Sequence, residues 1–431
     1  MLQARFAAAL ATLAILCLLL LRLQPSSSNN NYNDVSLGLN TKVFENTQDS
    51  MVSDFINMTA EIPGIFDEDT YTSDLTYFRK ENPDVFNALP ERFLENYKSF
   101  CWHNKTNDAQ LLCLPRAYLG GVIKCGSSEI HEKLLMHPEL SRGKTKEHKW
   151  WSRYRIQRPW RELSPDFKKK PFSNYLRDLL PQTVTEDTVL FDGSATLIWH
   201  QLFWEERYPF LEERPYSNAD MIRSITPDAK ILVIVRNPTE RLWSGYLFFH
   251  RNFPGSPNVS PMTFDDAVRK EIVRFRDCVK GKGLRRCCFD SKHLNRYDTA
   301  VVTLTLGIYI CYIREWKEKF GDHMKIIRLE DYGSRPSSTL HEVYEFLEVS
   351  PFSEEKIDAF INIHEAKETR NSNNRVLGDM LNSTRQLLNS FYRPFNLELA
   401  KLLNDNRFLY DSLIYRNHWK YYKLAKMILY L

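Results

Sequence analysis

Short apolar stretches separated by helical patterns recur through the middle of the chain. The clearest predict buried strands at Ala117–Ile123, Val189–Gly193, Lys230–Arg236 and Met324–Leu329. Longer amphipathic stretches predict helices at 129–136, 340–347 and 382–404. Apolar strands that alternate with helices are typical of a parallel sheet covered on both faces. We therefore expect an α/β fold, with a ligand beyond the carboxyl ends of the strands.

The start of the chain has a different pattern. Residues 6–21 form an unbroken apolar run between Arg5 and Arg22, slightly short of the roughly 20 residues that cross a typical bilayer. A cleaved signal peptide and an uncleaved signal anchor both fit this pattern, and the lack of a clear cleavage site favours the anchor. We expect a cytoplasmic tail at 1–5, a transmembrane anchor at 6–23, a flexible lumenal stem at 24–60 and one large folded domain at 61–431.

Composition excludes some classes of protein. The chain has 431 residues, of which 43% are hydrophobic and 26% are charged, so it is not a disordered chain. A net charge of only +4 argues against a histone-like nucleic-acid binder. Cations nevertheless gather in residues 142–170, where aromatic side chains are interleaved with them. Such a segment suits an acidic glycan, because guanidinium groups pair with sulfates and aromatic faces stack on sugars.

Sequons and cysteines indicate an oxidising lumen. Sequons for N-glycosylation stand at Asn57, Asn104, Asn258 and Asn382. Of the 8 cysteines, Cys17 lies in the apolar run, which leaves an odd number for the folded domain. Cys101 and Cys113 flank a short loop and are predicted to form a disulfide. Further pairs could form among Cys278, Cys287, Cys288 and Cys311.

The first predicted strand leads into a loop that could bind a phosphate. Gly121 and Gly126-Ser127-Ser128 have the glycines and the final hydroxyl of a Walker A loop, but Ser127 stands where that loop needs lysine. The lysine of this loop is Lys124, so the pattern argues against a nucleoside-triphosphate enzyme. Backbone amides at a helix start bind anions, and Ser127 or Ser128 is the expected N-cap. An ordinary glycine-rich turn would have the same pattern.

Two further segments could carry chemistry. Arg236 ends the third predicted strand, and Ser244 follows about two helical turns later, so both could reach a phosphate there. A structural ion pair of Arg236 with a carboxylate is the alternative. In the second segment, Glu147 stands among Lys146, His148 and Lys149. Nearby cations favour an ionised carboxylate, which suits a base that takes a proton from a hydroxyl; a solvated basic loop is the alternative.

In this order, the segments resemble those of the membrane-bound carbohydrate sulfotransferases of the Golgi. The resemblance rests on Ile-Lys-Cys-Gly-Ser-Ser, on Lys-Glu before paired aromatics, and on Val-Arg-Asn-Pro-x-x-Arg-x-x-Ser. Later segments around residues 329–332 and 391–400 also fit. Within the family the chain looks most like the chondroitin N-acetylgalactosamine 4-sulfate 6-O-sulfotransferases, followed by the heparan sulfate enzymes. The resemblance implies a P-loop-like parallel sheet flanked by helices, the sulfotransferase fold, in a single-pass type II Golgi membrane protein with a lumenal catalytic domain.

The resemblance also implies a role for each candidate residue. The donor would be 3′-phosphoadenosine 5′-phosphosulfate, with its 3′-phosphate at Arg236 and Ser244. Its 5′-phosphosulfate would lie on the loop, which comprises Lys124, Cys125, Gly126, Ser127 and Ser128. Lys124 would neutralise the leaving oxygen, and Glu147 would deprotonate the acceptor hydroxyl. The acceptor, a sulfated glycosaminoglycan, would contact Lys149, Trp150, Arg153 and Arg155.

We expect sulfation of C6 of N-acetylgalactosamine 4-sulfate in chondroitin or dermatan sulfate. The alternatives are a heparan sulfate O-sulfotransferase, a catalytically silent lumenal glycan-binding protein and a lumenal kinase with a degenerate P-loop. No metal and no nucleic acid is implied, and the oligomeric state, a homodimer or otherwise, is left open. The loop after the second strand, Asp192-Gly193-Ser194-Ala195, departs from the family pattern, so no substrate contact is assigned to it.

Overall fold

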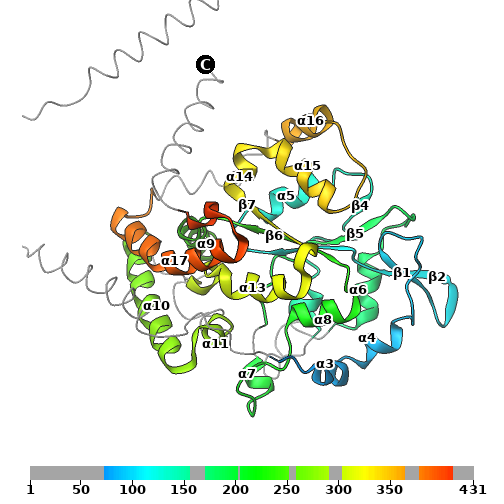
Figure 1. Cartoon of the computed structure of the whole chain (residues 1–431), viewed down its shortest axis with the longest axis horizontal. Coiled ribbons are helices and arrows are strands. Elements are labelled where there is room, and N and C mark those ends of the chain that lie inside the picture. Colours follow the sequence, from blue (N-terminus) through cyan, green and yellow to red (C-terminus); the bar gives the residue numbers. More distant parts are fainter. Residues whose placement is uncertain are drawn as a thin grey trace, which may run out of the picture. The chain divides into compact units, whose positions relative to one another are not determined.

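A five-stranded parallel sheet lies at the centre of the structure, with strand order β4-β5-β3-β6-β7 (Figure 1). The computed structural model describes residues 72–155, 170–201, 204–251, 259–290, 303–364 and 378–410. The strands of this sheet are β3 Ala117–Gly121, β4 Leu140–Ser141, β5 Val189–Asp192, β6 Lys230–Val235 and β7 Met324–Arg328.

The sheet agrees with the expectation drawn from the apolar stretches. Every residue of β3, β5 and β6 is buried, as expected of strands with helices on both faces. All of the predicted strands are present, and each ends one or two residues earlier than predicted. The two-residue strand β4 was not predicted, since so short a segment carries no periodic signal.

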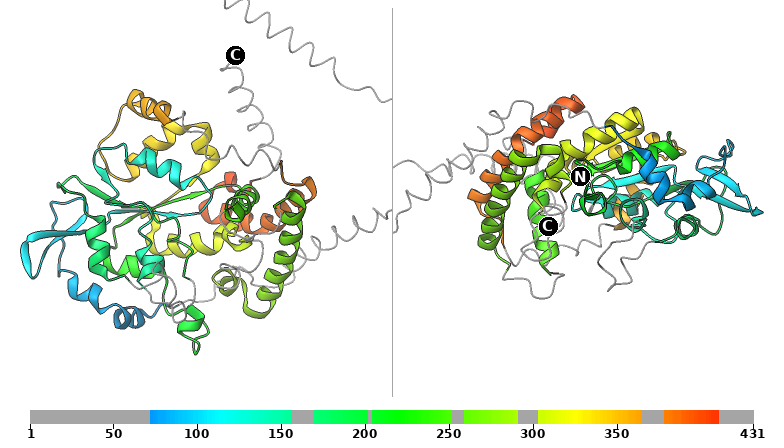
Figure 2. Two further views of the ribbon diagram at one scale, coloured as in Figure 1. Left: turned by 180° about the vertical axis from the view of Figure 1, so that it is seen from behind. Right: turned by 90° about the horizontal axis from the view of Figure 1, so that it is seen from below.

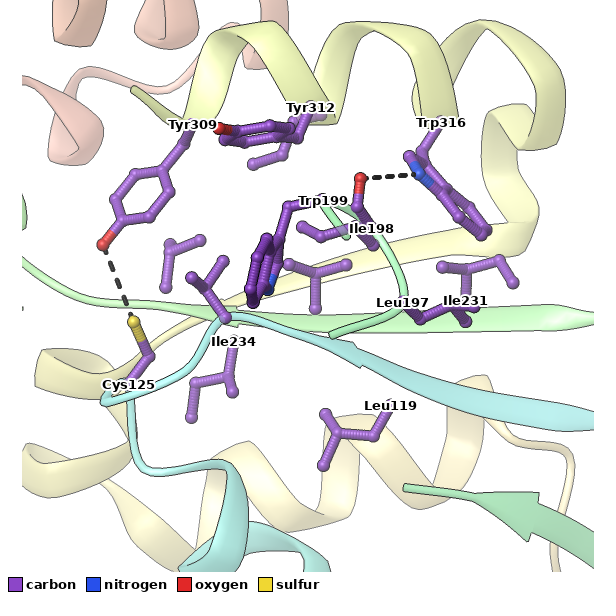
Figure 3. Close-up of a cluster of buried hydrophobic side chains, with 14 of the residues drawn as sticks. Leu119, Cys125, Leu197, Ile198, Trp199, Ile231, Ile234, Tyr309, Tyr312 and Trp316 are labelled. Carbon is purple, nitrogen blue, oxygen red and sulfur yellow. Dashed lines mark hydrogen bonds between the residues drawn. The ribbon is translucent and has the colours of Figure 1, made fainter. Parts of the chain in front are cut away.

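Helices cover both faces of the sheet (Figures 1 and 2). One face carries α5 Ser127–Leu134, α14 Leu329–Ser334, α15 Pro336–Phe346 and α16 Glu354–His364. The other face carries α6 Phe172–Leu179, α8 Asn218–Ile225 and α13 Tyr309–Phe320. Tyr309, Tyr312 and Trp316 project from α13 into the core, where Trp316 donates a hydrogen bond to the carbonyl of Ile198 (Figure 3).

Further helices gather near the carboxyl end of β6. They are α9 Pro238–Arg251, α10 Pro261–Lys282, α11 Leu284–Cys288 and α17 Asn382–Leu403. The remaining helices are α3 Leu75–Glu81, α4 Pro83–Ala88 and α7 Trp204–Arg207. A π-helical turn, η1, spans Trp150–Tyr154, and 3-10 turns lie at η3 Leu304–Gly307, η4 Gly321–His323 and η6 Asn406–Leu409.

An antiparallel hairpin precedes the sheet in the chain, where no strand was predicted. It pairs β1 Phe100–Asn104 with β2 Asn107–Leu114, and the predicted Cys101–Cys113 disulfide joins the two strands. Disulfides Cys278–Cys287 and Cys288–Cys311 connect α10 with α11 and α11 with α13. The remaining cysteine of the described residues, Cys125, is a buried free thiol.

Some sequence predictions concern residues outside the described ranges. These are the cytoplasmic tail at 1–5, the anchor at 6–23, the stem at 24–60 and the sequons at Asn57 and Asn258. Within the described ranges, none of the helices has the length and apolar character that crossing a membrane requires. Asn104 ends β1, where its side chain donates to Gln110, and Asn382 is an exposed first residue of α17.

Candidate active site

The loop between β3 and α5 lies at the carboxyl end of the central strand, as predicted. Gly126 precedes the helix and adopts a left-handed conformation with φ 86°. A Cβ atom at this position would lie 2.6 Å from Cδ1 of Leu329. The expected serine N-cap was therefore wrong: Ser127 and Ser128 already belong to the first turn of α5. The helix starts at a glycine because the chain turns there with positive φ and close to Leu329.

Lys124 and Arg236 meet at this loop. Burial lowers the pKa of Lys124, and the nearby positive charge of Arg236 lowers it further. A Cβ atom on Gly245 would lie 3.9 Å from Cγ of Lys124 and 4.0 Å from Nη1 of Arg241. The loop lysine, the arginine after β6 and the buried arginine of α9 therefore converge on one place.

The two arginines retain unused hydrogen-bond donors. The guanidinium of Arg236 makes no hydrogen bond or ion pair within the described ranges, although the nearby carboxylate of Glu330 attracts its charge. Arg241 is fully buried and donates from Nη2 to the carbonyl of Thr303 at 2.6 Å. Its Nε and Nη1 atoms have no well-aligned hydrogen-bond partner among the described residues, although the hydroxyl of Tyr392 lies close enough to interact with the guanidinium. Buried donors of this kind are expected where an anion binds.

Helix α9 presents one face to the loop. Arg241, Ser244 and Phe248 are spaced by three and four residues, so they share a side of the helix. Phe248 is 47% exposed, and the centre of its ring lies 3.9 Å from Nζ of Lys124. Asn237 immediately precedes the helix and caps its first turn, because its Oδ1 accepts from the backbone N–H of Thr239.

Glu147 lies beside the same loop. Nζ of Lys146 donates to Oγ of Ser128 at 2.7 Å and lies 3.6 Å from Oε1 of Glu147. Nζ of Lys149 lies 3.6 Å from the other carboxylate oxygen. The predicted base is thus flanked by two ammonium groups, one of which contacts the loop.

The loop after β5 holds this segment in place. Glu147 and Lys149 have positive φ angles of 66° and 54°, and the backbone N–H of Lys149 donates to Oγ of Ser194 at 2.8 Å. Ser194 in turn donates to Asp192 at 2.5 Å, which also accepts from the hydroxyl of Tyr175. The sequence analysis assigned no role to Asp192 or Ser194. The signal that could have found them is the Asp-x-Ser pattern at the end of a strand, where such side chains commonly bind nearby backbone groups.

Two of the predicted acceptor contacts are contradicted by burial. Trp150 is 1% exposed, and its Nε1 donates to the carbonyl of Lys170. Arg155 is 2% exposed and donates to the carbonyl of Trp151 and to the hydroxyl of Tyr216. Both side chains belong to the core, where no glycan can reach them. Lys149 and Arg153 remain partly exposed on the same segment.

Cys125 connects the loop with the end of β6. Its Sγ lies 3.6 Å from the hydroxyl of Tyr309, which donates to the backbone carbonyl of Arg236 at 2.8 Å (Figure 3). Burial raises the pKa of the Cys125 thiol to about 11. The thiol therefore stays protonated near neutral pH, and it stabilises the loop rather than acting as a nucleophile.

The arrangement suits a ligand with several negative charges. Lys124, Arg236, Arg241 and Lys146 lie around the loop. The acidic Glu330, which is partly buried, lies near Arg236 and accepts from the backbone N–H of Asn237. Burial raises the pKa of Glu330, although backbone hydrogen bonds and the nearby charges of Arg328 and Arg236 oppose this shift. Within the described ranges, no group of three or more His, Cys, Asp or Glu residues is placed to hold a metal ion.

Comparison with known proteins identifies relatives of this chain. Residues 119–393 match the family model described as "Sulfotransferase domain". Carbohydrate sulfotransferase 15 of Rattus norvegicus is 28% identical over 426 residues, which cover 84% of this chain and 74% of the relative. The Homo sapiens protein of that name is 29% identical, with 79% and 69% covered. These relatives confirm the resemblance to carbohydrate sulfotransferases inferred from the motifs.

More distant matches were also found. The bifunctional heparan sulfate N-deacetylase/N-sulfotransferase 2 of Homo sapiens is 23% identical over 68% of this chain and 30% of its own length. A solved sulfotransferase structure from Alicyclobacillus acidocaldarius is 17% identical, with a TM-score of 0.45, and covers 68% of this chain and 97% of that one.

Proposed function

The chain belongs to the sulfotransferase domain family, and on this premise we propose that it sulfates a glycosaminoglycan. The donor is 3′-phosphoadenosine 5′-phosphosulfate, and the acceptor is the C6 hydroxyl of N-acetylgalactosamine 4-sulfate in chondroitin or dermatan sulfate. The observation that carries the proposal is the convergence of Lys124, Arg236 and Arg241 on the loop that also adjoins Glu147.

The residues present fit such a donor, since unpartnered guanidinium donors beside a tight glycine turn at a helix start suit a polyanion. Arg236 and Ser244 would hold its 3′-phosphate. Lys124 and the amides at the start of α5 would hold its 5′-phosphosulfate. The donor supplies an activated sulfuryl group. The protein contributes the positioning of the two reactants and the stabilisation of the charge that develops during transfer.

Different side chains of the site have different roles in the sulfuryl transfer. Glu147 takes the proton of the acceptor hydroxyl while the oxygen forms its bond to sulfur. Lys124 stabilises the charge that develops on the bridging oxygen as its bond to sulfur breaks. Lys149 and Arg153, which are partly exposed beside Glu147, pair with sulfate or carboxylate groups of the acceptor.

The test is transfer of labelled sulfate to chondroitin, dermatan and heparan chains, with disaccharide analysis of the products. We expect a 6-sulfated N-acetylgalactosamine 4-sulfate product, and losses of at least about 100-fold in Lys124→Ala and Glu147→Ala. Lys144→Ala is the matched control, because this lysine belongs to the same segment but pairs with Asp178 at 3.6 Å. Transfer to heparan alone would contradict the proposed acceptor. Donor binding without any transfer would support a catalytically silent glycan-binding protein instead.

The same proposal includes a location in the Golgi, with residues 6–23 as the anchor of a type II membrane protein. The disulfides and the sequon at the exposed Asn382 support a lumenal catalytic domain. Glycosidase treatment should increase the mobility of the full-length protein, and Asn382→Gln should remove part of that change. Resistance of the whole chain to the glycosidase would contradict a lumenal domain.

A further inference from the structure

Lys146 contacts both the donor loop and the proposed base. Its ammonium donates to Ser128 in the first turn of α5 and lies 3.6 Å from Glu147. The contact with Ser128 connects positions 18 residues apart in the chain, so it fixes the segment that carries Glu147 against the start of the helix. Only 20% of the Lys146 side chain is exposed, which limits the positions that its ammonium can take.

Lys149 provides a natural comparison. Its ammonium lies at the same distance, 3.6 Å, from the other oxygen of Glu147, and 27% of its side chain is exposed. Its anchor is different, because its backbone N–H is held by Ser194 at the end of β5. The two lysines thus offer Glu147 similar charges, but Lys146 also holds the donor loop.

We propose that Lys146 is a positioning residue that couples the base to the donor loop. This inference rests on the proposed function and adds a role that the motifs did not assign. The ammonium of Lys146 donates to Ser128 and pairs with Glu147, so the carboxylate keeps a fixed position relative to the loop that holds the donor. A displacement of the base by about 1 Å costs on the order of 100-fold in rate, so this connection should affect kcat.

A double-mutant cycle tests the coupling. We compare Ser128→Ala, Lys146→Met and the double variant by kcat at saturating donor, so that direct effects on donor binding appear in KM. Lys146→Met should lower kcat by about 10- to 100-fold, and adding Ser128→Ala should lower it little further, because the connection is already lost. Ser128→Ala combined with Lys149→Met should lose the product of the two single effects, since Lys149 is anchored elsewhere.

The outcomes separate this inference from the proposed function. Multiplicative losses in the Ser128–Lys146 pair, in a parent that transfers sulfate, would overturn the coupling and leave the function intact. A parent without transfer to any of the glycans would overturn both. Melting temperatures verify that each variant is folded, and Lys146→Gln repeats the cycle with a polar side chain in case Lys146→Met fails to fold.

Discussion

Phe248 shows how charge explains the position of a single side chain. It is a large apolar residue with 47% of its surface exposed, yet the ammonium of Lys124 lies 3.9 Å from the centre of its ring. An ammonium over an aromatic face is stabilised by about 0.5–2 kcal/mol. Since Phe248 lies one helical turn beyond Ser244, its ring holds the lysine beside the face of α9 that meets the loop.

Replacement of Phe248 by leucine should therefore reduce activity without affecting stability. Leucine keeps the apolar character but has no ring face, so we expect kcat/KM for the donor to fall by about 3- to 30-fold with an unchanged melting temperature. Phe210→Leu is the control, because Phe210 is 70% exposed and contacts Tyr208 edge to face. Equal rates in the two variants would show that the ring does not position Lys124.

The sequence identified some residues of the candidate active site and missed others. Lys124 and Arg236 could be found from the sequence, because a cation at the end of a buried strand lies where ligands bind in such sheets. Arg241 and Lys146 could not, because their roles depend on contacts with Thr303 and Ser128, which are distant in sequence. The error at Trp150 has the same origin: composition cannot separate an aromatic core from an aromatic surface.

At the scale of elements, the start of α5 depends on one glycine. Gly126 has φ 86°, and a Cβ atom there would approach Leu329 to 2.6 Å. Gly126→Ala should therefore destabilise the fold by more than about 1 kcal/mol and weaken donor binding. Gly281→Ala in α10 is the matched control, because nothing lies within 4 Å of its added Cβ, and it should stabilise the helix by about 0.5–1 kcal/mol. Urea unfolding measures both; equal stabilities would contradict the strain at Gly126.

Other elements differed in how well the sequence predicted them. Strands β3 and β6 were found because each is buried along its whole length and, apart from Lys230, carries no charged side chain. The β1–β2 hairpin was not, because the outer half of β2 is exposed and polar and the pairing is closed by the Cys101–Cys113 disulfide. Cys101 and Cys113 pack against Leu190, which is distant in the sequence, and neither this contact nor the cross-link leaves a periodic pattern in the sequence.

At the scale of the whole molecule, stability in acid depends on a buried histidine. His131 of α5 is fully buried, stacks on Phe191 of β5, and lies so close to Gly193 that a Cβ there would come within 2.3 Å of its ring. Its two ring nitrogens have no partner among the described residues. Burial lowers the pKa of His131 to about 3, and the positive charges of Lys146 and Arg142 add to the effect, with a smaller contribution from His148.

The lowered pKa makes the fold sensitive to acid in a defined range. The ordinary value is 6.5, so between pH 6.5 and about 3 the unfolded chain binds a proton on this histidine that the folded protein does not. The free energy of unfolding therefore decreases as the pH falls through this range, by at most about 1.4 kcal/mol per pH unit from this group. Above pH 6.5 the histidine is neutral in both states and contributes no pH dependence.

His131→Leu should flatten the acid side of the stability curve. The leucine cannot bind a proton, so unfolding free energies of the variant and the parent, measured in urea from pH 4 to 8, should converge as the pH falls or should cross. The difference between them above pH 6.5 is the internal control, since it reports only the changed packing against Phe191 and Gly193. Parallel curves over the whole range would mean that the folded protein protonates His131 as readily as the unfolded chain does. The contact between α5 and β5 would then have to admit water or an anion beside the ring of His131.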